Sequence, residues 1–468
     1  MLDSALNFAR LNRQSHLSRL SDWLRIPSIS TTPEHAPDVR RAADFAAQYL
    51  CEMGMNKVEV RETAGHPVVY ANHQSPIANH QLPTLLIYGH FDVQPTDPDD
   101  EWTRPPFEPT VEGDNLYARG ASDDKGQAFA VLAALESYLK TSRRLPVNVK
   151  VLLEGEEEIT SPNLIPYVQS HADELKADAI LIADQDMLSP QHPVAMWGLR
   201  GLIYTEIEVT SPARDLHSGT FGGSVDNPFN ALVCLLAQLQ DGESRRVLIP
   251  NFYANVEELN DEERALISQA PINDEIGLHF TGAPKLAGEA GYPLAERISV
   301  RPTLDIHGIV GGFTGEGSKT VIPSKATAKV SMRLVPNQTP DEVFESLKSY
   351  LQSICPPTVK LSVRNIGQAV PVKVDYKHPA VQAAATAYEK GFGHKPVYLR
   401  SGGSLPIVHD MIEHVGRIDN PPYEIPVVMI GFGLPDDRTH SPNEKFHLPN
   451  FYRGIETVIH YLDLFSKA

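Results

Sequence analysis

The sequence predicts an α/β domain that is interrupted by an inserted α+β domain. In the first 200 residues short apolar strands alternate with helical stretches, and this pattern resumes after residue 380. Between these two parts, strands alternate apolar and polar residues as half-exposed antiparallel strands do. The first pattern is typical of a mixed, mainly parallel sheet with helices on both faces. We place the α/β domain at residues 1–201 and 374–468, and the inserted domain at residues 202–373.

Apolar periodicity predicts the elements of the α/β domain in order. A helix over 37–53 has apolar side chains at helical spacing, and Pro37 suits its first turn. We then expect strands at 57–61, 68–71 and 84–88, a helix over about 125–140, and strands at 147–153 and 179–183 with a helix between them. After residue 380 we expect a helix over 380–392, strands at 397–399 and 426–430, and a closing helix over about 449–465.

The inserted domain has a different pattern. Strands are expected at 203–210, 327–334 and 359–363, because apolar and polar residues alternate there. Helices are expected over 228–240 and 340–351. Strands of this kind with helices on one face predict an α+β sandwich.

Composition excludes several classes of protein. The net charge of the 468 residues is −18, which argues against nucleic acid or an anionic membrane as a partner. We find no run of about 18 apolar residues, so no transmembrane helix is expected. The first twenty residues lack the apolar stretch of a secretory signal. Three widely spaced cysteines argue against a disulfide framework, so we expect a cytoplasmic protein.

Polar residues that could carry chemistry follow the apolar strands. The strand at 84–88 leads into Gly-His-Phe-Asp, the strand at 147–153 leads into an acidic run at 154–158, and the strand at 179–183 is followed by Asp184. A glycine-rich turn at 119–126 opens a helix, and His440 follows the strand at 426–430. Taken alone, each has an ordinary alternative, because acidic runs commonly begin solvated helices and single aspartates commonly form turns or caps.

Taken together, these residues indicate a metal site. The carboxyl ends of parallel strands meet at one edge of a sheet, so the side chains that follow them gather there. Imidazoles and carboxylates without thiolate suit Zn²⁺, Mn²⁺ or Co²⁺ in a catalytic site better than a structural zinc. The set is too large for one tetrahedral zinc. It suits two ions about 3.5–4 Å apart that share a carboxylate, as in co-catalytic hydrolases.

The sequence resembles the metallopeptidase family M20. The resemblance is carried by Tyr-Gly-His-Phe-Asp-Val-Gln-Pro at 88–95, Arg-Gly-Ala-Ser-Asp-Asp-Lys-Gly at 119–126 and Glu-Gly-Glu-Glu-Glu at 154–158. Shorter segments extend it over nearly the whole chain, namely Leu-His-Ser-Gly at 216–219, Lys-Thr-Val-Ile-Pro at 319–323, Arg-Leu-Val-Pro at 333–336, Gly-Gly-Ser at 402–404 and His-Ser-Pro-Asn-Glu at 440–444. The variants of these motifs are similar to those of the carnosinase-like, cytosolic dipeptidases.

This resemblance implies a metal-dependent hydrolase that cleaves the amide bond of dipeptides or short peptides. It implies two divalent ions per subunit, with Zn²⁺ preferred and Mn²⁺ or Co²⁺ as alternatives. His90 and Asp184 would bind one ion, Glu158 and His440 the other, and Asp123 both.

The resemblance also implies roles for residues beside the ligands. Asp92 would orient His90, and Glu157 would be the general base. The acidic run permits a shift of one residue, and we prefer Glu157 because Glu154 and Gly155 anchor the alignment. The peptide bond after Asp123 is expected to be cis, as is typical of the family.

In the inserted domain, the resemblance implies a lid and a dimerisation surface. His217 would polarise the scissile carbonyl, in many relatives across a homodimer, and stabilise the oxyanion. Arg333, Thr320 and Ser404 would hold the carboxylate of the substrate. The ordinary alternative for Arg333 is a salt bridge on the surface of a strand.

The sequence departs from the family at two places, of which the second puts the substrate preference in doubt. Glu158 is followed by Ile159 rather than by the Ser-Gly-Ser of many relatives, and Ser401 stands where dipeptidase relatives often have glutamate. No residue decides what occupies the acyl side of the substrate, so an alternative function is an N-acyl amino acid deacylase of the acetylornithine deacetylase or succinyl-diaminopimelate desuccinylase type. A second alternative is a non-catalytic descendant on the same fold.

Overall fold

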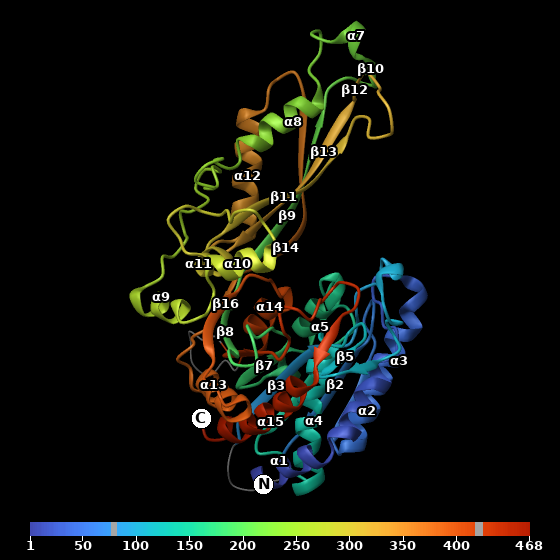
Figure 1. Ribbon diagram of the computed structural model, residues 1–468, viewed down its shortest axis with the longest axis vertical. Helices are drawn as coiled ribbons and strands as arrows, with labels where there is room; N and C mark the ends of the chain where they lie inside the picture. The colour runs from blue at the N-terminus through green and yellow to red at the C-terminus, as the bar shows by residue number, and fades with distance from the viewer. Residues whose placement is uncertain (76–81, 417–424) are drawn as a thin grey trace. The chain divides into compact units, whose positions relative to one another are not determined.

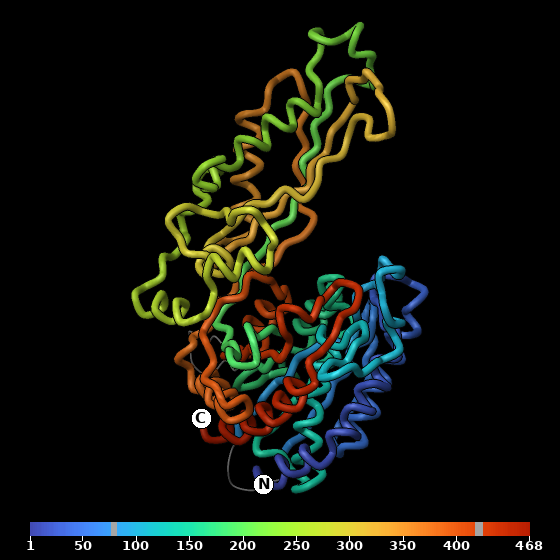
Figure 2. Tube along the Cα trace, viewed as in Figure 1, coloured from blue at the N-terminus to red at the C-terminus, as the bar shows by residue number. Residues whose placement is uncertain are grey.

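A computed structural model describes residues 1–75, 82–416 and 425–468 of the chain (Figure 1). The chain forms two compact units. The first unit comprises Met1–Trp197, Val374–Leu399 and Ile407–Ala468, and the second comprises Gly198–Lys373 and Arg400–Pro406. Almost all of the second unit is one continuous segment of the chain, coloured from green to orange in Figure 2. In the sequence, this segment separates two segments of the first unit.

The framework of the first unit is a nine-stranded sheet, of which only the edge strand β15 falls wholly within the residues of the second unit. Its order is β1-β2-β6-β3-β7-β17-β8-β15, with β16 also paired to β8. The strands are β1 (Lys57–Arg61), β2 (Val68–His73), β3 (Thr84–His90), β6 (Asn148–Glu154), β7 (Ala179–Ala183), β8 (Val194–Leu199), β15 (Val372–Lys373), β16 (Val397–Ser401) and β17 (Val427–Ile430). The central strands β6, β3, β7 and β17 are parallel, and antiparallel pairs flank them.

Helices cover the central strands, whose residues are mostly buried. Every residue of β3, β7 and β17 is buried, as expected for parallel strands between layers of helices. Helix α4 packs against β3 and β7, and α13 packs against β17. The predicted fold class, an α/β sheet with a parallel centre covered by helices, is confirmed.

The helices of the first unit agree with the apolar periodicity where it is clear. They are α1 (Leu2–Leu11), α2 (Arg13–Leu24), α3 (Ala36–Met53), α4 (Lys125–Ser142), α5 (Leu164–Ser170), α6 (Ala172–Leu175), α13 (Pro379–Phe392), α14 (Pro406–Val415) and α15 (Leu448–Phe465), with single turns η1 (Pro33–His35), η2 (Asp99–Glu101) and η3 (Glu157–Ile159). Helix α3 ends at Met53, and the next residue, Gly54, has a φ of 107°, which glycine readily adopts. Sequence analysis does not predict α1, α2 and α14.

A small sheet joins two loops of the first unit. Its order is β18-β5-β4, and its strands are β4 (Thr110–Glu112), β5 (Asn115–Tyr117) and β18 (Lys445–His447). Because β18 pairs with β5, the loop before β18 and the loop after β5 lie side by side. The first of these loops contains His440, and the second contains Asp123.

The second unit has an antiparallel sheet of order β11-β13-β9-β14. Its strands are β9 (Gly201–Thr210), β11 (Thr303–Gly311), β13 (Lys325–Leu334) and β14 (Lys360–Ala369). Helices α8 (Pro228–Ala237) and α12 (Pro340–Ile354) pack against it, and burial alternates along β9 as the sequence pattern predicts. The remaining elements are β10 (Leu216–His217), α7 (Ser218–Phe221), α9 (Asp261–Ser268), α10 (Asp274–Thr281), α11 (Leu294–Ser299) and β12 (Val321–Ile322).

Two further observations concern the whole described chain. Within these residues, no helix is both long enough and apolar enough to cross a membrane. The peptide bond between Asp123 and Asp124 is cis, so this expectation is confirmed.

Candidate active site

The candidate site lies in the first unit, where neighbouring strands of the sheet end. Strand β3 ends at His90, β6 ends at Glu154, and β7 ends one residue before Asp184. These strands are adjacent and parallel, so their carboxyl ends meet at one edge of the sheet. Asp123 and Asp124 reach the same edge from the loop that opens α4.

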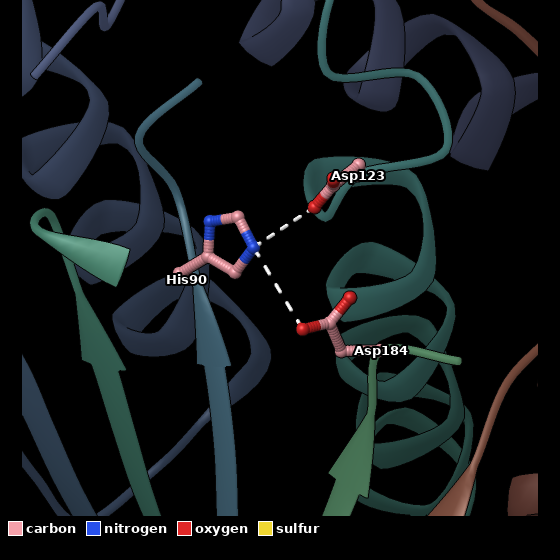
Figure 3. Close-up of side chains that lie close together, drawn as sticks. All are labelled: His90, Asp123 and Asp184. Atoms are coloured by element: carbon pink, nitrogen blue, oxygen red, sulfur yellow. Dashed lines mark hydrogen bonds and ion pairs between the residues drawn. The ribbon is translucent and has the colours of Figure 1, made fainter. Parts of the chain in front are cut away.

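One group of possible metal ligands consists of His90, Asp123 and Asp184 (Figure 3). The Nε2 atom of His90 lies 3.1 Å from Oδ1 of Asp123 and 3.9 Å from Oδ2 of Asp184. The His90 side chain is fully buried, whereas the two carboxylates keep some exposure. One atom from each residue can therefore face a common point.

A second group shares Asp123 with the first. Its members are Asp123, Glu158 and His440, again with one possible ligand atom from each. Nε2 of His440 lies 2.9 Å from Oδ2 of Asp123 and 3.3 Å from Oε2 of Glu158. Asp123 thus presents one oxygen to each group, which is the arrangement expected of a carboxylate that bridges two ions.

Asp92 contacts residues of both groups of possible ligands. Nδ1 of His90 lies 3.4 Å from Oδ1 of Asp92 and 3.1 Å from its backbone carbonyl oxygen. The carboxylate of Asp92 accepts hydrogen bonds from the backbone N–H groups of Glu157 and Glu158, at 3.2 and 3.1 Å. Asp92 is fully buried, so one carboxylate orients both the histidine of one group and the turn that carries Glu158.

Burial and crowding disfavour negative charge on several carboxyl groups of the site. Burial raises the pKa of Glu157 to about 7, with Glu158 and Asp123 adding to the effect against the opposing charge of His90. Burial also raises the pKa of Asp184 well above its ordinary value, and it raises the pKa of Glu158.

The pKa values of the two histidines are raised, as expected for imidazoles beside carboxylates. Hydrogen bonds to Asp123 and Glu158 raise the pKa of His440 to about 10. Burial opposes the charged form of His90, yet its bonds to Asp123 and Asp92 hold its pKa well above the ordinary value. A buried cluster of carboxylates that is compensated by imidazole protons fits divalent cations, because a cation replaces those protons with greater charge. The oxygen and nitrogen donors suit Zn²⁺, Mn²⁺ and Co²⁺.

Two of the predicted residues of the inserted domain lie together at one end of the second unit. His217 is the last residue of β10, is exposed, and accepts a hydrogen bond at Nδ1 from the backbone of Gly219 at 2.9 Å. Thr320 precedes β12, which pairs with β10, and its carbonyl oxygen accepts the backbone N–H of Ser218.

Arg333 and Ser404 form a second pair in the same unit. Nη1 of Arg333 donates to Oγ of Ser404 at 2.9 Å, and the Ser404 hydroxyl donates to the carbonyl oxygen of Arg200. The structure does not bring Thr320 to this pair. Thr320 precedes the start of β13, whereas Arg333 is next to its end, so about 26 Å of strand separates them at roughly 3.3 Å per residue.

Several residues of the site were not assigned a role from sequence. Gln94 donates to Oε2 of Glu158 at 2.7 Å, and Asp124 accepts the backbone N–H of His90 at 3.3 Å. Glu444 is fully buried against the loop that carries Asp123. All three lie inside segments that resemble the family, so the sequence indicated that these positions matter. It did not indicate which atoms their side chains contact.

Two ligand groups that share one aspartate, at the carboxyl edge of a mixed sheet, define a metal-dependent hydrolase. The sequence matches the model of Peptidase family M20/M25/M40 over residues 86–464, and the chain belongs to this family. It is therefore a metallopeptidase, and the resemblance found in the sequence is confirmed.

Similar proteins cover the whole length of the chain. Cys-Gly metallodipeptidase DUG1 of Candida albicans is 33% identical over 97% of this chain and 95% of its own. Beta-Ala-His dipeptidase of Mus musculus is 30% identical over 100% of this chain and 96% of its own.

Solved structures of peptidases are also similar to this chain. The M20 family metallo-carboxypeptidase Sso-CP2 from Sulfolobus solfataricus is 35% identical, with a TM-score of 0.85 over 97% of this chain and 99% of that chain. Human carnosine dipeptidase 1 is 28% identical, with a TM-score of 0.84 over 100% of this chain and 99% of that chain.

Proposed function

We propose that this metallopeptidase hydrolyses the amide bond of dipeptides or short peptides. The observation that carries the proposal is the pair of ligand groups that share Asp123. Relatives of similar length that are named dipeptidases support the peptide substrate. Those names do not favour the alternative of an N-acyl amino acid deacylase. Every proposed ligand and the proposed base are present, which argues against a non-catalytic descendant.

The proposed metal centre holds two divalent ions in each subunit, with Zn²⁺ as the preferred ion and Mn²⁺ or Co²⁺ as alternatives. His90 and Asp184 would hold one ion, Glu158 and His440 the other, and Asp123 both. When bound, such a pair supplies Lewis acidity and a water molecule of lowered pKa.

The chain's own residues supply the proton transfer. Glu157 is the proposed general base: it accepts the proton of the attacking water and returns it to the leaving amine. Burial raises the pKa of this carboxyl group above its ordinary value, which makes it a better proton acceptor than an exposed carboxylate. Asp92 fixes the ring of His90 and the turn that carries Glu157.

Residues of the second unit are proposed to bind the substrate. The guanidinium group of Arg333 and the hydroxyl group of Ser404 are already hydrogen-bonded, and this pair suits a carboxylate. His217 would polarise the scissile carbonyl and stabilise the oxyanion. Thr320, which lies beside His217, is proposed to hold the carboxylate of the substrate together with Arg333 and Ser404. We assign the catalytic role to residues 1–201 and 374–468, and the role of lid and dimerisation domain to residues 202–373.

A homodimer through this domain is proposed, and two observations support it. His217 and Thr320 lie at the opposite end of β13 from Arg333 and Ser404, so a second copy could supply the missing pair to a complete site. Strand β11 is an edge strand with exposed apolar side chains, and Val310 is 72% exposed. An unpaired edge of this kind is suited to pairing with another copy.

Complementation tests the homodimer. We expect His217→Ala and Glu157→Gln to be inactive separately. Equal mixing with subunit exchange should then restore about a quarter of the sites, because half of the dimers are mixed and each has one complete site. Inactive mixtures in which exchange is verified would reject a role for His217 across the dimer.

The substrate is tested on protein stripped with a chelator and reloaded with Zn²⁺, Mn²⁺ or Co²⁺. A panel of dipeptides is compared with N-acetyl and N-succinyl amino acids. Metal-dependent release from dipeptides supports the proposal, and activity confined to acyl amino acids replaces it by the deacylase.

We further propose a cytoplasmic location without nucleic-acid or membrane partners, supported by the acidic charge and by three free cysteines.

A further inference from the structure

We infer that Glu444 is a positioning residue that holds the loops of Asp123 and His440 in register and thereby sets the affinity of the metal centre. The inference rests on the proposed function only in that it requires the metal pair. Glu444 is fully buried and follows His440 by four residues. Its carboxylate lies against the backbone of the loop that leads to Asp123.

Each oxygen of Glu444 accepts two hydrogen bonds. Oε2 accepts Nη1 of Arg119 at 2.8 Å and the backbone N–H of Gly120 at 2.9 Å. Oε1 accepts the backbone N–H groups of Ser122 and Asp123 at 2.8 and 3.1 Å. One carboxylate therefore fixes the backbone of the loop up to the residue that both ligand groups share.

The same carboxylate anchors the loop of His440. Arg438, His440 and Asn443 have φ angles of 58°, 60° and 64°, a region that residues other than glycine rarely occupy. Such a loop keeps its conformation only where its ends are held. Glu444 holds one end through its side chain and through its carbonyl oxygen, which accepts the backbone N–H of Ala118.

Asn443 holds the same loop from another side. Its Oδ1 accepts the backbone N–H and the hydroxyl group of Thr103, and its Nδ2 donates to the carbonyl oxygen of Glu101. These contacts hold the chain three residues after His440 but do not reach Asp123. Among the residues of this loop, Glu444 is the one whose side chain bonds to the backbone of Asp123.

The chemistry of the contacts requires a carboxylate at this position. All four partners are hydrogen-bond donors, and Arg119 is itself buried. In Glu444→Gln the amide nitrogen cannot accept a hydrogen bond, so two of the four donors lose their partner whichever way the amide is turned. Arg119 also loses its buried counter-charge.

The test is metal affinity in the absence of substrate. Zn²⁺ is titrated into stripped wild-type protein, Glu444→Gln and Glu444→Asp, in competition with a chromophoric chelator. The matched control is Glu136→Gln, a carboxylate on α4 that accepts hydrogen bonds from His16 and Tyr49 away from the ligand groups. We expect Glu444→Gln to bind the weaker of two ions about 10- to 100-fold less tightly, and Glu136→Gln to bind both as wild type does.

A kinetic measurement separates positioning from general loss of structure. Excess Zn²⁺ should restore most of the kcat of Glu444→Gln while KM stays near the wild-type value.

Wild-type metal affinity in a folded Glu444→Gln overturns the inference, and so does an equal loss of affinity in Glu136→Gln. If Glu444→Gln does not fold, Glu444→Asp decides, since it retains the charge and both oxygens: weaker affinity supports the inference and wild-type affinity overturns it. If wild-type protein binds two ions but hydrolyses no peptide, the proposed function fails while the affinities still decide the role of Glu444.

Discussion

Replacing Glu157 by glutamine removes the proposed general base while almost preserving the size of the side chain. General bases contribute about 10²- to 10⁴-fold to rate, or about 2.7–5.4 kcal/mol of activation free energy. We therefore expect kcat to fall by that factor while both ions stay bound. Steady-state kinetics with a dipeptide and metal analysis of the same sample measure the two quantities.

The pKa of Glu157 indicates why lost activity would not reflect unfolding. Its pKa of about 7 lies above the ordinary value of 4.5, so folding disfavours the ionised form by about 3 kcal/mol above pH 7. This cost disappears below pH 4.5, where the group is protonated in both states. Because glutamine carries no charge, the stripped variant should be at least as stable as wild type at pH 8.

The pKa of Glu157 also predicts a pH profile. The base acts when it has lost its proton, so activity should rise with pH through its pKa. Bound divalent ions favour the carboxylate and place this rise below pH 7. In Glu157→Gln the rise attributed to this group should be absent.

The neighbouring Glu156 is the matched control. It is buried and accepts hydrogen bonds from the backbone of His66 and from Asn163, so its role is structural. Glu156→Gln should lose stability by about 1–3 kcal/mol but keep a kcat close to that of wild type. A near-normal rate in Glu157→Gln, or a loss of its metal, would refute the assignment of the base.

Three further predictions concern metal binding and stability. Asp123→Asn should lose metal from both groups, because each takes one oxygen of Asp123, and elemental analysis after dialysis should find less than one ion per chain; two retained ions would contradict the shared ligand. Metal binding should release protons and weaken as pH falls, because the pKa of His440 is raised to about 10 and an ion must displace its proton; calorimetry in buffers of different ionisation enthalpy would contradict this if the heats were equal. Tyr388→Phe should lower the free energy of unfolding by about 1–3 kcal/mol without changing metal affinity, because the Tyr388 hydroxyl bonds both the N–H and the carbonyl of Gly431; urea denaturation with an unchanged midpoint would exclude this.

Several elements were predicted from sequence close to their observed bounds, and others were not. Strand β1 has the predicted bounds, and α3 begins one residue earlier than expected. Helices α1, α2 and α14 of the first unit were missed. Helix α2 buries His16, Leu17, Leu20, Trp23 and Leu24, so its buried face mixes polar and apolar side chains and gives a weak periodic signal. Helix α2 packs against α4, and tertiary contacts of this kind stabilise helices whose local signal is weak.

The sequence by itself determined the family and the identities of the proposed ligands. These depend on short segments whose order along the chain is specific, and on residue types that bind divalent ions. Only the tertiary structure decided which atoms meet. Asp123 presents one oxygen to each group, Glu444 binds a loop more than 300 residues away, and Thr320 lies apart from Arg333. Such contacts form between segments that are distant in sequence, so their partners are set by the pairing of strands and the packing of helices, which local patterns do not specify.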